Sequence, residues 1–319
     1  MIVAVYGAEA YIERCARSLF GQTLEDMEFV FVDDCSPDGS IAVLERVIEE
    51  FPQRNGQVKM IRNERNRGVG SSRQIGIDAA TGEYLIHCDP DDWVEPDMYE
   101  RLYETAMGDR AKGADRADVV VCDFFENTET SENVLRQVVP DSIAERISAV
   151  AAERLHMSLC NKLIKGEVAK SIRVLSGLSL WEDWCYNMHI MLGAYRIIKA
   201  DEAFYHYRVD NGASIVHTIN RKHIDSMMRA VDKFNQLLSS RPELREEIDP
   251  RDILLIKWKV KCGYLTNPTR KMRREWLEIY PETNKAYWRL NIPLKGKICT
   301  FCMVHNQLWF IRLYNRLRK

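Results

Sequence analysis

The chain has 319 residues, 46% of them apolar and 29% charged, which is the composition of an ordinary globular protein and excludes a disordered or fibrous one. The net charge of −2 is unevenly distributed, because Arg251 to Lys319 contains 16 Lys and Arg against 4 Asp and Glu, leaving 29 against 43 for residues 1–250. A basic C-terminal region on an acidic body indicates an anionic partner, either lipid headgroups or nucleic acid.

Nine cysteines are scattered through expected strands and helices, which favours a reducing, cytosolic compartment over a disulfide framework. Cys299 and Cys302 have the spacing of a metal or redox pair, but no second pair or suitably spaced His accompanies them, so a shared helix face is the preferred interpretation. No apolar run approaches the roughly 20 residues that span a bilayer. Met1 leads directly into a strand without a signal peptide. We expect a cytoplasmic location, including the inner face of the cytoplasmic membrane.

The first ninety residues alternate short apolar runs with helical patterns. Strands are predicted at Ile2–Tyr6, Phe29–Val32, Val58–Ile61 and Tyr84–Cys88, and helices at residues 11–20, at 41–51 and in a segment ending at Ala80. This rhythm of strand and helix predicts an α/β domain with a Rossmann-like, mostly parallel sheet and helices on both faces.

Polar clusters follow three of these strands: Tyr6-Gly7-Ala8, Asp33-Asp34 and Asp89-Pro90-Asp91-Asp92. Ligands bind at the carboxyl ends of strands in such sheets. Crowded carboxylates are stable when a divalent cation and substrate phosphates sit among them, so a metal-bound, phosphate-bearing substrate is the first hypothesis. The alternative is a solvated acidic loop that caps the helix beginning near Asp97. Arg73, in the first turn of its helix, can direct its guanidinium at phosphate or carboxylate.

A second acidic pair, Glu182-Asp183, lies between Trp181 and Trp184 where another helical pattern begins. Acids in a first turn are favoured by the helix dipole, which is one interpretation. Flanking tryptophans would desolvate a carboxylate and raise its pKa, which suits a general base, and the residues alone do not decide between the two. His217, further along, is a candidate metal ligand, although a lone His is more often a packing residue.

The remaining predicted elements are strands and then helices. The strands are Asp118–Cys122, Tyr195–Lys199 and Phe204–Arg208, with an exposed loop or hairpin at residues 126–140, and the helices are Ile224–Leu238, Ile253–Leu265 and Ile298–Leu317. The last helix is basic and rich in aromatic residues, which is typical of a helix lying on a membrane surface. Its apolar side would otherwise pack against the domain.

Taken together, these segments resemble the family 2 inverting glycosyltransferases of GT-A fold, of the bacterial cell-surface polysaccharide type. The resemblance rests on Val3-Ala4-Val5-Tyr6, residues 18–23, residues 32–40, Asn66-Arg67-Gly68, Gly82-Glu83-Tyr84 and residues 89–93. It implies a GT-A nucleotide-sugar glycosyltransferase domain at residues 1–215, followed by a basic, helical C-terminal region at 216–319.

The resemblance also implies residue roles. On the donor side, Asp34 recognises the nucleotide base, Asp89 and Asp91 hold Mn²⁺ or Mg²⁺ and the diphosphate, with Asp91 the direct ligand, and Arg73 approaches the donor. Val5, Tyr6 and Glu9 complete the nucleotide-sugar site. On the acceptor side, Asp183 is the catalytic base, and Glu182 is the alternative candidate for this role.

The implied activity is metal-dependent transfer of a sugar from a nucleotide-diphosphate sugar, with UDP-sugar favoured, to a saccharide or lipid-linked acceptor. Two departures bear on it: the family usually has Pro at position 4, where this chain has Ala4, and Asn at position 7, where it has Gly7. A shortened first strand predicts weaker donor binding. The alternatives are a sugar nucleotidyltransferase and a protein that binds nucleic acid through the basic tail, although no nucleic acid is expected.

Overall fold

The computed structural model describes residues 1–108, 115–210, 219–265 and 268–316. The chain divides into two compact units, the first made of Met1–Asp141 and His156–Gly212 and the second of Ser142–Leu155 and Ala213–Lys319. The predicted domain boundary at residues 215 and 216 and the candidate ligand His217 fall in the segment 211–218, outside the described residues.

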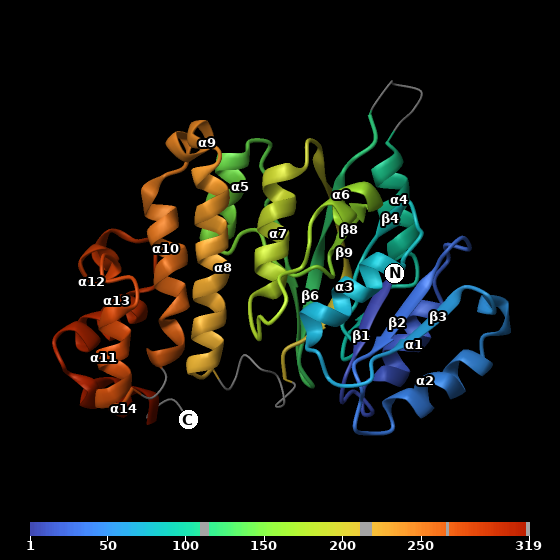
Figure 1. Cartoon of the computed structure of the whole chain (residues 1–319), viewed down its shortest axis with the longest axis horizontal. Coiled ribbons are helices and arrows are strands. Elements are labelled where there is room, and N and C mark those ends of the chain that lie inside the picture. The colour runs from blue at the N-terminus through green and yellow to red at the C-terminus, as the bar shows by residue number, and fades with distance from the viewer. Residues whose placement is uncertain (109–114, 211–218, 266–267, 317–319) are drawn as a thin grey trace. The chain divides into compact units, whose positions relative to one another are not determined.

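The first unit opens with three parallel strands in the order β1-β2-β3 (Figure 1). Ile2 is paired with Val30, and Phe29 with Val58. The elements are β1 (Ile2–Val5), α1 (Ile12–Phe20), β2 (Phe29–Asp33), α2 (Ser40–Glu49), the 3-10 helix η1 (Pro52–Arg54), β3 (Val58–Arg62) and α3 (Val69–Ala79). All of β2 is buried, as expected for a strand between two neighbours and covered on both faces.

The fourth predicted strand joins this parallel sheet to a mixed sheet. Ile2 N donates to Ile86 O over 2.9 Å and Cys88 N donates to Ile2 O over 3.0 Å, so residues 86–88 run parallel beside β1. The preceding two residues form β4, which pairs antiparallel with β8. The rest of this unit consists of β4 (Tyr84–Leu85), β5 (Trp93–Val94), α4 (Met98–Met107), β6 (Val119–Asn127), β7 (Glu132–Leu135), β8 (Lys162–Lys165), α6 (Gly166–Ser171), α7 (Glu182–Gly193) and β9 (Ile197–Arg208).

The mixed sheet has the order β4-β8-β6-β9-β5, with β7 beside β6. β6 and β9 are parallel, whereas β8 and β7 pair antiparallel with β6, and β5 pairs antiparallel with β9. The segment predicted as a loop or hairpin at 126–140 contains the β6–β7 hairpin. The strands predicted separately at 195–199 and 204–208 are one strand, β9.

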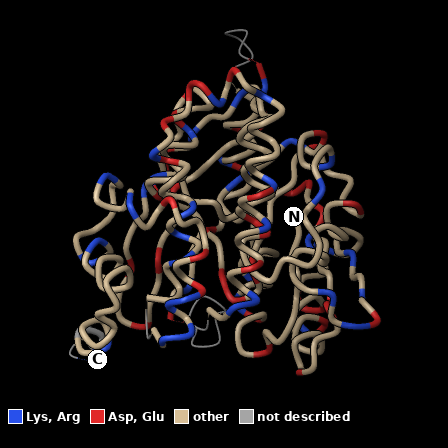
Figure 2. The backbone as a smooth tube through the Cα atoms, turned by 60° about the vertical axis from the view of Figure 1, so that its left-hand side comes forward, with Lys and Arg blue, Asp and Glu red and all other residues tan. Residues whose placement is uncertain are grey.

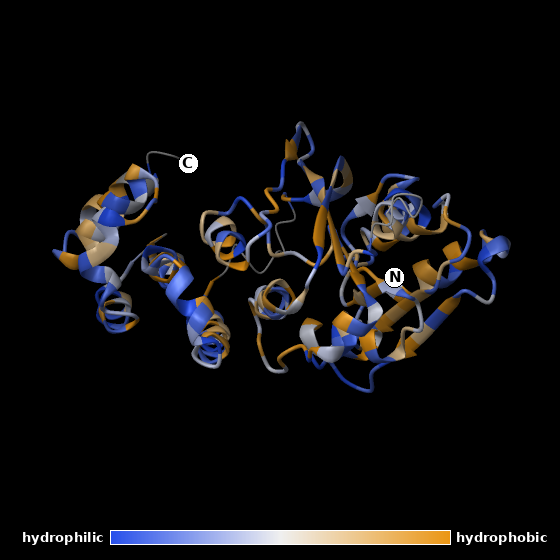
Figure 3. Cartoon of the chain, turned by 90° about the horizontal axis from the view of Figure 1, so that it is seen from above, coloured by the Kyte–Doolittle hydropathy of each residue, from blue (hydrophilic) through white to orange (hydrophobic). Residues whose placement is uncertain are grey.

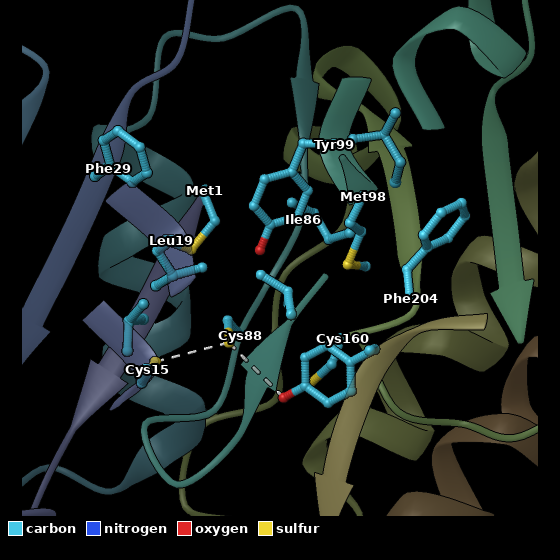
Figure 4. Close-up of a cluster of buried hydrophobic side chains, with 14 of the residues drawn as sticks. Met1, Cys15, Leu19, Phe29, Ile86, Cys88, Met98, Tyr99, Cys160 and Phe204 are labelled. Atoms are coloured by element: carbon cyan, nitrogen blue, oxygen red, sulfur yellow. Dashed lines mark hydrogen bonds between the residues drawn. The ribbon is translucent and has the colours of Figure 1, made fainter. Parts of the chain in front are cut away.

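Helices cover both faces of the parallel strands. The helices α1, α2 and α4 share one buried cluster with Val3, Val5 and Phe31. Figure 4 shows part of this cluster, including Leu19 of α1 and Met98 of α4. The helix α3 packs on the opposite face, where an ideal Cβ at Gly76 would lie 2.3 Å from Cγ2 of Ile2, so only glycine permits this approach. The predicted α/β class with helices on both faces is confirmed.

The second unit is helical. Its elements are α5 (Ile143–Ala151), α8 (Arg221–Ser239), α9 (Pro242–Glu247), α10 (Pro250–Val260), η4 (Cys262–Leu265), α11 (Arg270–Glu278), α12 (Thr283–Ala286), η5 (Tyr287–Arg289), α13 (Leu294–Val304) and α14 (Leu308–Arg316). The prediction of one helix over 298–317 is wrong, because the chain turns at Asn306, whose φ is 61°. Asn tolerates this left-handed conformation better than most residues, so it separates α13 from α14. Residue 317 lies outside the described residues.

Candidate active site

Arg73 brings the two predicted acidic clusters into one network. It projects from the second turn of α3 and not from the first turn as predicted, because the helix begins at Val69, and its side chain is 7% exposed. Nη2 donates to Oδ1 of Asp89 over 2.7 Å, and Nη1 donates to Oε1 of Glu182 over 2.7 Å. A planar guanidinium can hold two carboxylates at fixed positions in this way, whereas an ammonium presents a single point charge. The end of the fourth predicted strand and the start of α7 are therefore joined through Arg73.

The charges in this network stabilise one another. Burial opposes the charge of Arg73, but the carboxylates of Asp89, Glu182 and Asp183 raise its pKa well above the ordinary value. Burial likewise favours protonation of Asp89, but the adjacent Arg73 guanidinium lowers the Asp89 pKa below its ordinary value. At neutral pH the site therefore contains a charged Arg73 and an ionised Asp89.

The start of α7 places Asp183 in a desolvated position. Trp181 precedes the helix with φ of 66°, a left-handed conformation that is unusual for a bulky residue, and its ring stacks on Trp184 with centroids 5.1 Å apart. Burial, followed by the charge of Glu182, raises the pKa of Asp183 from 3.8 to about 7. A carboxylate with this pKa can accept a proton near neutral pH.

Asp34 organises the turn that leads into α3. It is 2% exposed. Its Oδ1 accepts hydrogen bonds from Nδ2 of Asn63 over 2.8 Å and from Arg67 N over 2.9 Å, and its Oδ2 accepts from Gly68 N over 2.8 Å. The sequence reasoning assigned Asp34 to the nucleotide base and did not anticipate this second task, which fixes the segment that carries Arg73.

The residues after β1 differ in what they can offer a ligand. Val5 is fully buried, and its carbonyl accepts from Asp34 N over 2.9 Å, while Tyr6 is 51% exposed. Gly7 has φ of 63°, a left-handed conformation that glycine adopts freely and that Asn tolerates better than most residues. Oε2 of Glu9 accepts from Gly39 N over 2.9 Å, which ties this segment to the start of α2.

Asp92 is held by β9, a contact that the sequence did not reveal. It is 1% exposed, and its oxygens accept from the Tyr205 hydroxyl over 2.5 Å and from Arg208 N over 2.8 Å. Burial, and then the charges of Asp91 and Asp89, raise the pKa of Asp92 well above its ordinary value. The alternating aromatic and polar residues at 204–208 predicted a strand, but pattern alone does not identify its partner.

A loop before β8 also supports Asp89. The Cys160 thiol donates to Oδ2 of Asp89 over 3.5 Å. The loop is fixed by the fully buried Lys162, whose Nζ donates to the carbonyls of His156 and Ser158 over 2.6 and 2.8 Å and to Oδ1 of Asn161 over 2.8 Å. The sequence did not predict this loop, because β8 is only four residues long, with Lys at both ends, and gives no clear strand pattern.

The Asp89–Asp92 turn offers carboxylate oxygens, the type of ligand that Mn²⁺ and Mg²⁺ prefer. Among the described residues, no three His, Cys, Asp or Glu side chains converge as a protein-only metal site. Divalent ions in phosphate-binding sites use one or two carboxylates together with phosphate oxygens, so such a group is not required. Arg73 and Cys160 donate hydrogen bonds to Asp89, and Tyr205 and the backbone N of Arg208 donate to Asp92. These bonds hold both of these carboxylates in fixed positions.

Comparison with known proteins assigns the chain to the glycosyltransferases of GT-A fold. Residues 1–150 match the family described as Glycosyl transferase family 2. The chain is 31% identical over 277 residues to the protein EpsH of Bacillus subtilis, covering 81% of this chain and 77% of that protein. The chain therefore belongs to glycosyl transferase family 2. Membership in this family sets aside the sugar nucleotidyltransferase alternative.

Solved structures show the same fold. TarS of S. aureus, residues 1–349 in complex with UDP-GlcNAc, has a TM-score of 0.66 and 19% identity, covering 98% of this chain and 87% of that chain. The mannosyltransferase PcManGT of Pyrobaculum calidifontis, in complex with GDP-Man and Mn²⁺, has a TM-score of 0.51 and 15% identity, covering 100% and 86%. These two structures hold different nucleotide-sugars, so the fold alone does not select the donor.

Proposed function

We propose that the protein transfers a sugar from a nucleotide-diphosphate sugar, with UDP-sugar favoured, to an acceptor hydroxyl with inversion at the anomeric carbon. The acceptor is a saccharide or a lipid-linked saccharide in cell-surface polysaccharide or glycolipid synthesis. The observation that carries the proposal is the Arg73 bridge, because it joins Asp89, at the end of the fourth predicted strand, to Glu182 beside Asp183. In this proposal, the network connects the donor side of the site with the acceptor side.

The donor occupies the edge formed by Asp34, the segment after β1 and the Asp89–Asp92 turn. Asp34 and the turn that it organises face the base, while the Val5 backbone, Tyr6 and Glu9 line the nucleotide. Asp91, together with Asp89, would hold Mn²⁺ or Mg²⁺. When bound, the metal neutralises charge that develops on the departing diphosphate.

Asp183 removes the proton from the acceptor hydroxyl. The hydroxyl oxygen forms a bond to the anomeric carbon as the bond from that carbon to the nucleoside diphosphate breaks, and the proton ends on the Asp183 carboxylate. Attack from the face opposite the leaving group inverts the configuration without a covalent enzyme intermediate. The pKa of about 7 matches this role, because the carboxylate must be ionised to start the reaction and basic enough to accept the proton.

A donor panel tests the proposal. UDP-, GDP-, CDP- and dTDP-sugars are added with Mn²⁺ or with EDTA, and thermal shift and nucleotide release are recorded. One donor should stabilise the protein and release nucleotide in a metal-dependent way, since a ligand bound only to the native state raises the melting temperature. No shift and no release with every donor would reject the proposal.

Two variants and a matched control assign the roles. Asp91→Asn should lose the donor-dependent shift, whereas Asp183→Asn should keep it and lose transfer. Asp201→Asn is the control, because that side chain is 86% exposed in the same unit and should change neither. The configuration of the product, determined by NMR, tests inversion: a product with the donor's anomeric configuration would contradict the mechanism.

A further inference from the structure

Helix α13 has two contrasting faces. Its buried side, with Cys299, Thr300, Cys302 and Met303, packs within the second unit, where Nε1 of Trp258 donates to Oγ1 of Thr300 over 2.9 Å. Leu294, Ile298 and Phe301, spaced four and three residues apart, are 68%, 37% and 41% exposed. This spacing places the three on one side of the helix, so α13 presents an apolar stripe that its own unit does not cover.

Helix α14 repeats this arrangement. Leu308 and Ile311 are buried, while Trp309, Phe310 and Leu313 are 62%, 38% and 48% exposed. We define the C-terminal apolar surface as the exposed residues of both helices: Leu294, Ile298, Phe301, Trp309, Phe310 and Leu313. Figure 3 colours these helices by hydropathy. Of the twelve exposed large hydrophobic residues in the described part of the chain, these six and Trp288 lie in 288–313, whereas single exposed residues elsewhere are ordinary.

The sequence around this surface carries positive charge alone. Glu282 is the last acidic residue, and eight Lys and Arg follow it. Six of them lie in the described residues: Lys285, Arg289, Lys295, Lys297, Arg312 and Arg316, drawn in blue in Figure 2. Arg318 and Lys319 lie outside the described residues. Exposed aromatic and aliphatic side chains in a stretch of sequence that contains Lys and Arg but no Asp or Glu match an interface whose interior is apolar and whose boundary is anionic.

We propose that the C-terminal apolar surface docks on an anionic lipid bilayer, with α13 and α14 lying in the headgroup layer. No helix in the described segments is both long and apolar enough to cross a bilayer, so docking would be peripheral. A second copy of the chain fits this surface poorly, because a two-fold contact would face the same cations against each other. The inference does not depend on the proposed transferase activity.

Vesicle flotation with the full chain tests docking. Vesicles of phosphatidylcholine mixed with phosphatidylglycerol should carry the protein, whereas phosphatidylcholine alone should bind it far more weakly, and added salt should release it. The double variant Trp309→Ser with Leu313→Ser should reduce binding by on the order of tenfold or more, because it removes two exposed apolar side chains. Lys295→Gln with Arg316→Gln should reduce binding on the order of tenfold on anionic vesicles alone.

Controls match each change with an exposed residue elsewhere. Tyr195→Ser removes an aromatic ring that is 94% exposed in the first unit, and Lys222→Gln removes an exposed charge on α8. Both should bind vesicles like the parent chain. Light scattering without lipid examines self-association: a dimer abolished by Trp309→Ser with Leu313→Ser, in a protein that does not float with anionic vesicles, would overturn the proposal. Equal binding by parent and variants would also overturn it.

Discussion

The Tyr205 hydroxyl donates a hydrogen bond of 2.5 Å to Asp92 and also accepts one from Asp89 N over 3.1 Å. A single buried phenol on β9 therefore fixes both ends of the Asp-Pro-Asp-Asp turn. Tyr205→Phe should destabilise the protein by about 1–3 kcal/mol, because it leaves Asp92 and the Asp89 amide without this partner. The affinity of this variant for the nucleotide-sugar donor should fall as well. Urea denaturation and donor thermal shift measure the two effects.

Tyr99→Phe is the matched control for this change. Tyr99 is also 2% exposed, but its hydroxyl has no hydrogen-bond partner among the described residues. Removing an unsatisfied buried hydroxyl should leave the free energy of unfolding unchanged or increase it. If Tyr99→Phe and Tyr205→Phe destabilise the protein equally, the loss reflects the space left by the missing hydroxyl and not the bonds to the turn.

Arg73→Lys keeps the positive charge but removes the guanidinium group that donates to both Asp89 and Glu182. One ammonium cannot replace two bonds of 2.7 Å to separate carboxylates, so a buried carboxylate loses its partner. We expect a loss of about 3 kcal/mol in stability, at the lower end for broken buried pairs because Asp89 is 28% exposed, and loss of transfer. Arg173→Lys is the control: its pair with Asp78 is exposed on both sides, and the change should be below about 1 kcal/mol.

The parallel strands, and the sheet edge at which Asp34 and Asp89 lie, could be predicted from the pattern of apolar residues along the sequence. β1 and β2 are continuous apolar runs, and the rule that ligands bind at strand carboxyl ends placed Asp34 and Asp89 on one edge. The contact between Asp92 and Tyr205 was not predictable, since 113 residues separate them and β5 and β4 contain only two residues each. Pairing of such short strands is set by register and packing in the folded sheet, which no local pattern records.

The prediction of a single C-terminal helix at residues 298–317 is wrong for a different reason. The apolar spacing continues across residues 298–313, so periodicity predicts one helix. The break depends on a single left-handed residue, Asn306, and on the bond that Gln307 N donates to Cys302 O over 2.7 Å. Asn is common within helices as well as at their ends, and its conformation is decided by packing around it.

Gly76→Ala tests whether the packing of α3 on β1 positions Arg73. The added methyl group would meet Ile2 Cγ2 at 2.3 Å, so α3 must shift, which should destabilise the protein by about 1–3 kcal/mol. Arg73 lies three residues before Gly76 on the same helix, so transfer should fall as well. Gly193→Ala, at the end of α7 with no atom within 4 Å of the added group, should be neutral in both assays. Unchanged activity in Gly76→Ala would show that Arg73 tolerates the shift.

The raised pKa of Asp183 predicts that activity and stability respond to pH in opposite directions. Its carboxylate must be ionised to accept a proton, so turnover should rise as pH increases and level off above its pKa of about 7. The folded protein holds a proton here that the unfolded chain releases near 3.8, so the stabilisation from the neutral carboxyl is present below about pH 4 and is lost as pH rises through 7. Asp183→Asn should therefore abolish turnover while gaining stability over the parent as the pH rises from 4 to 8. Turnover that falls between pH 6 and 8, or a variant less stable than the parent at pH 8, would exclude Asp183 as a desolvated base.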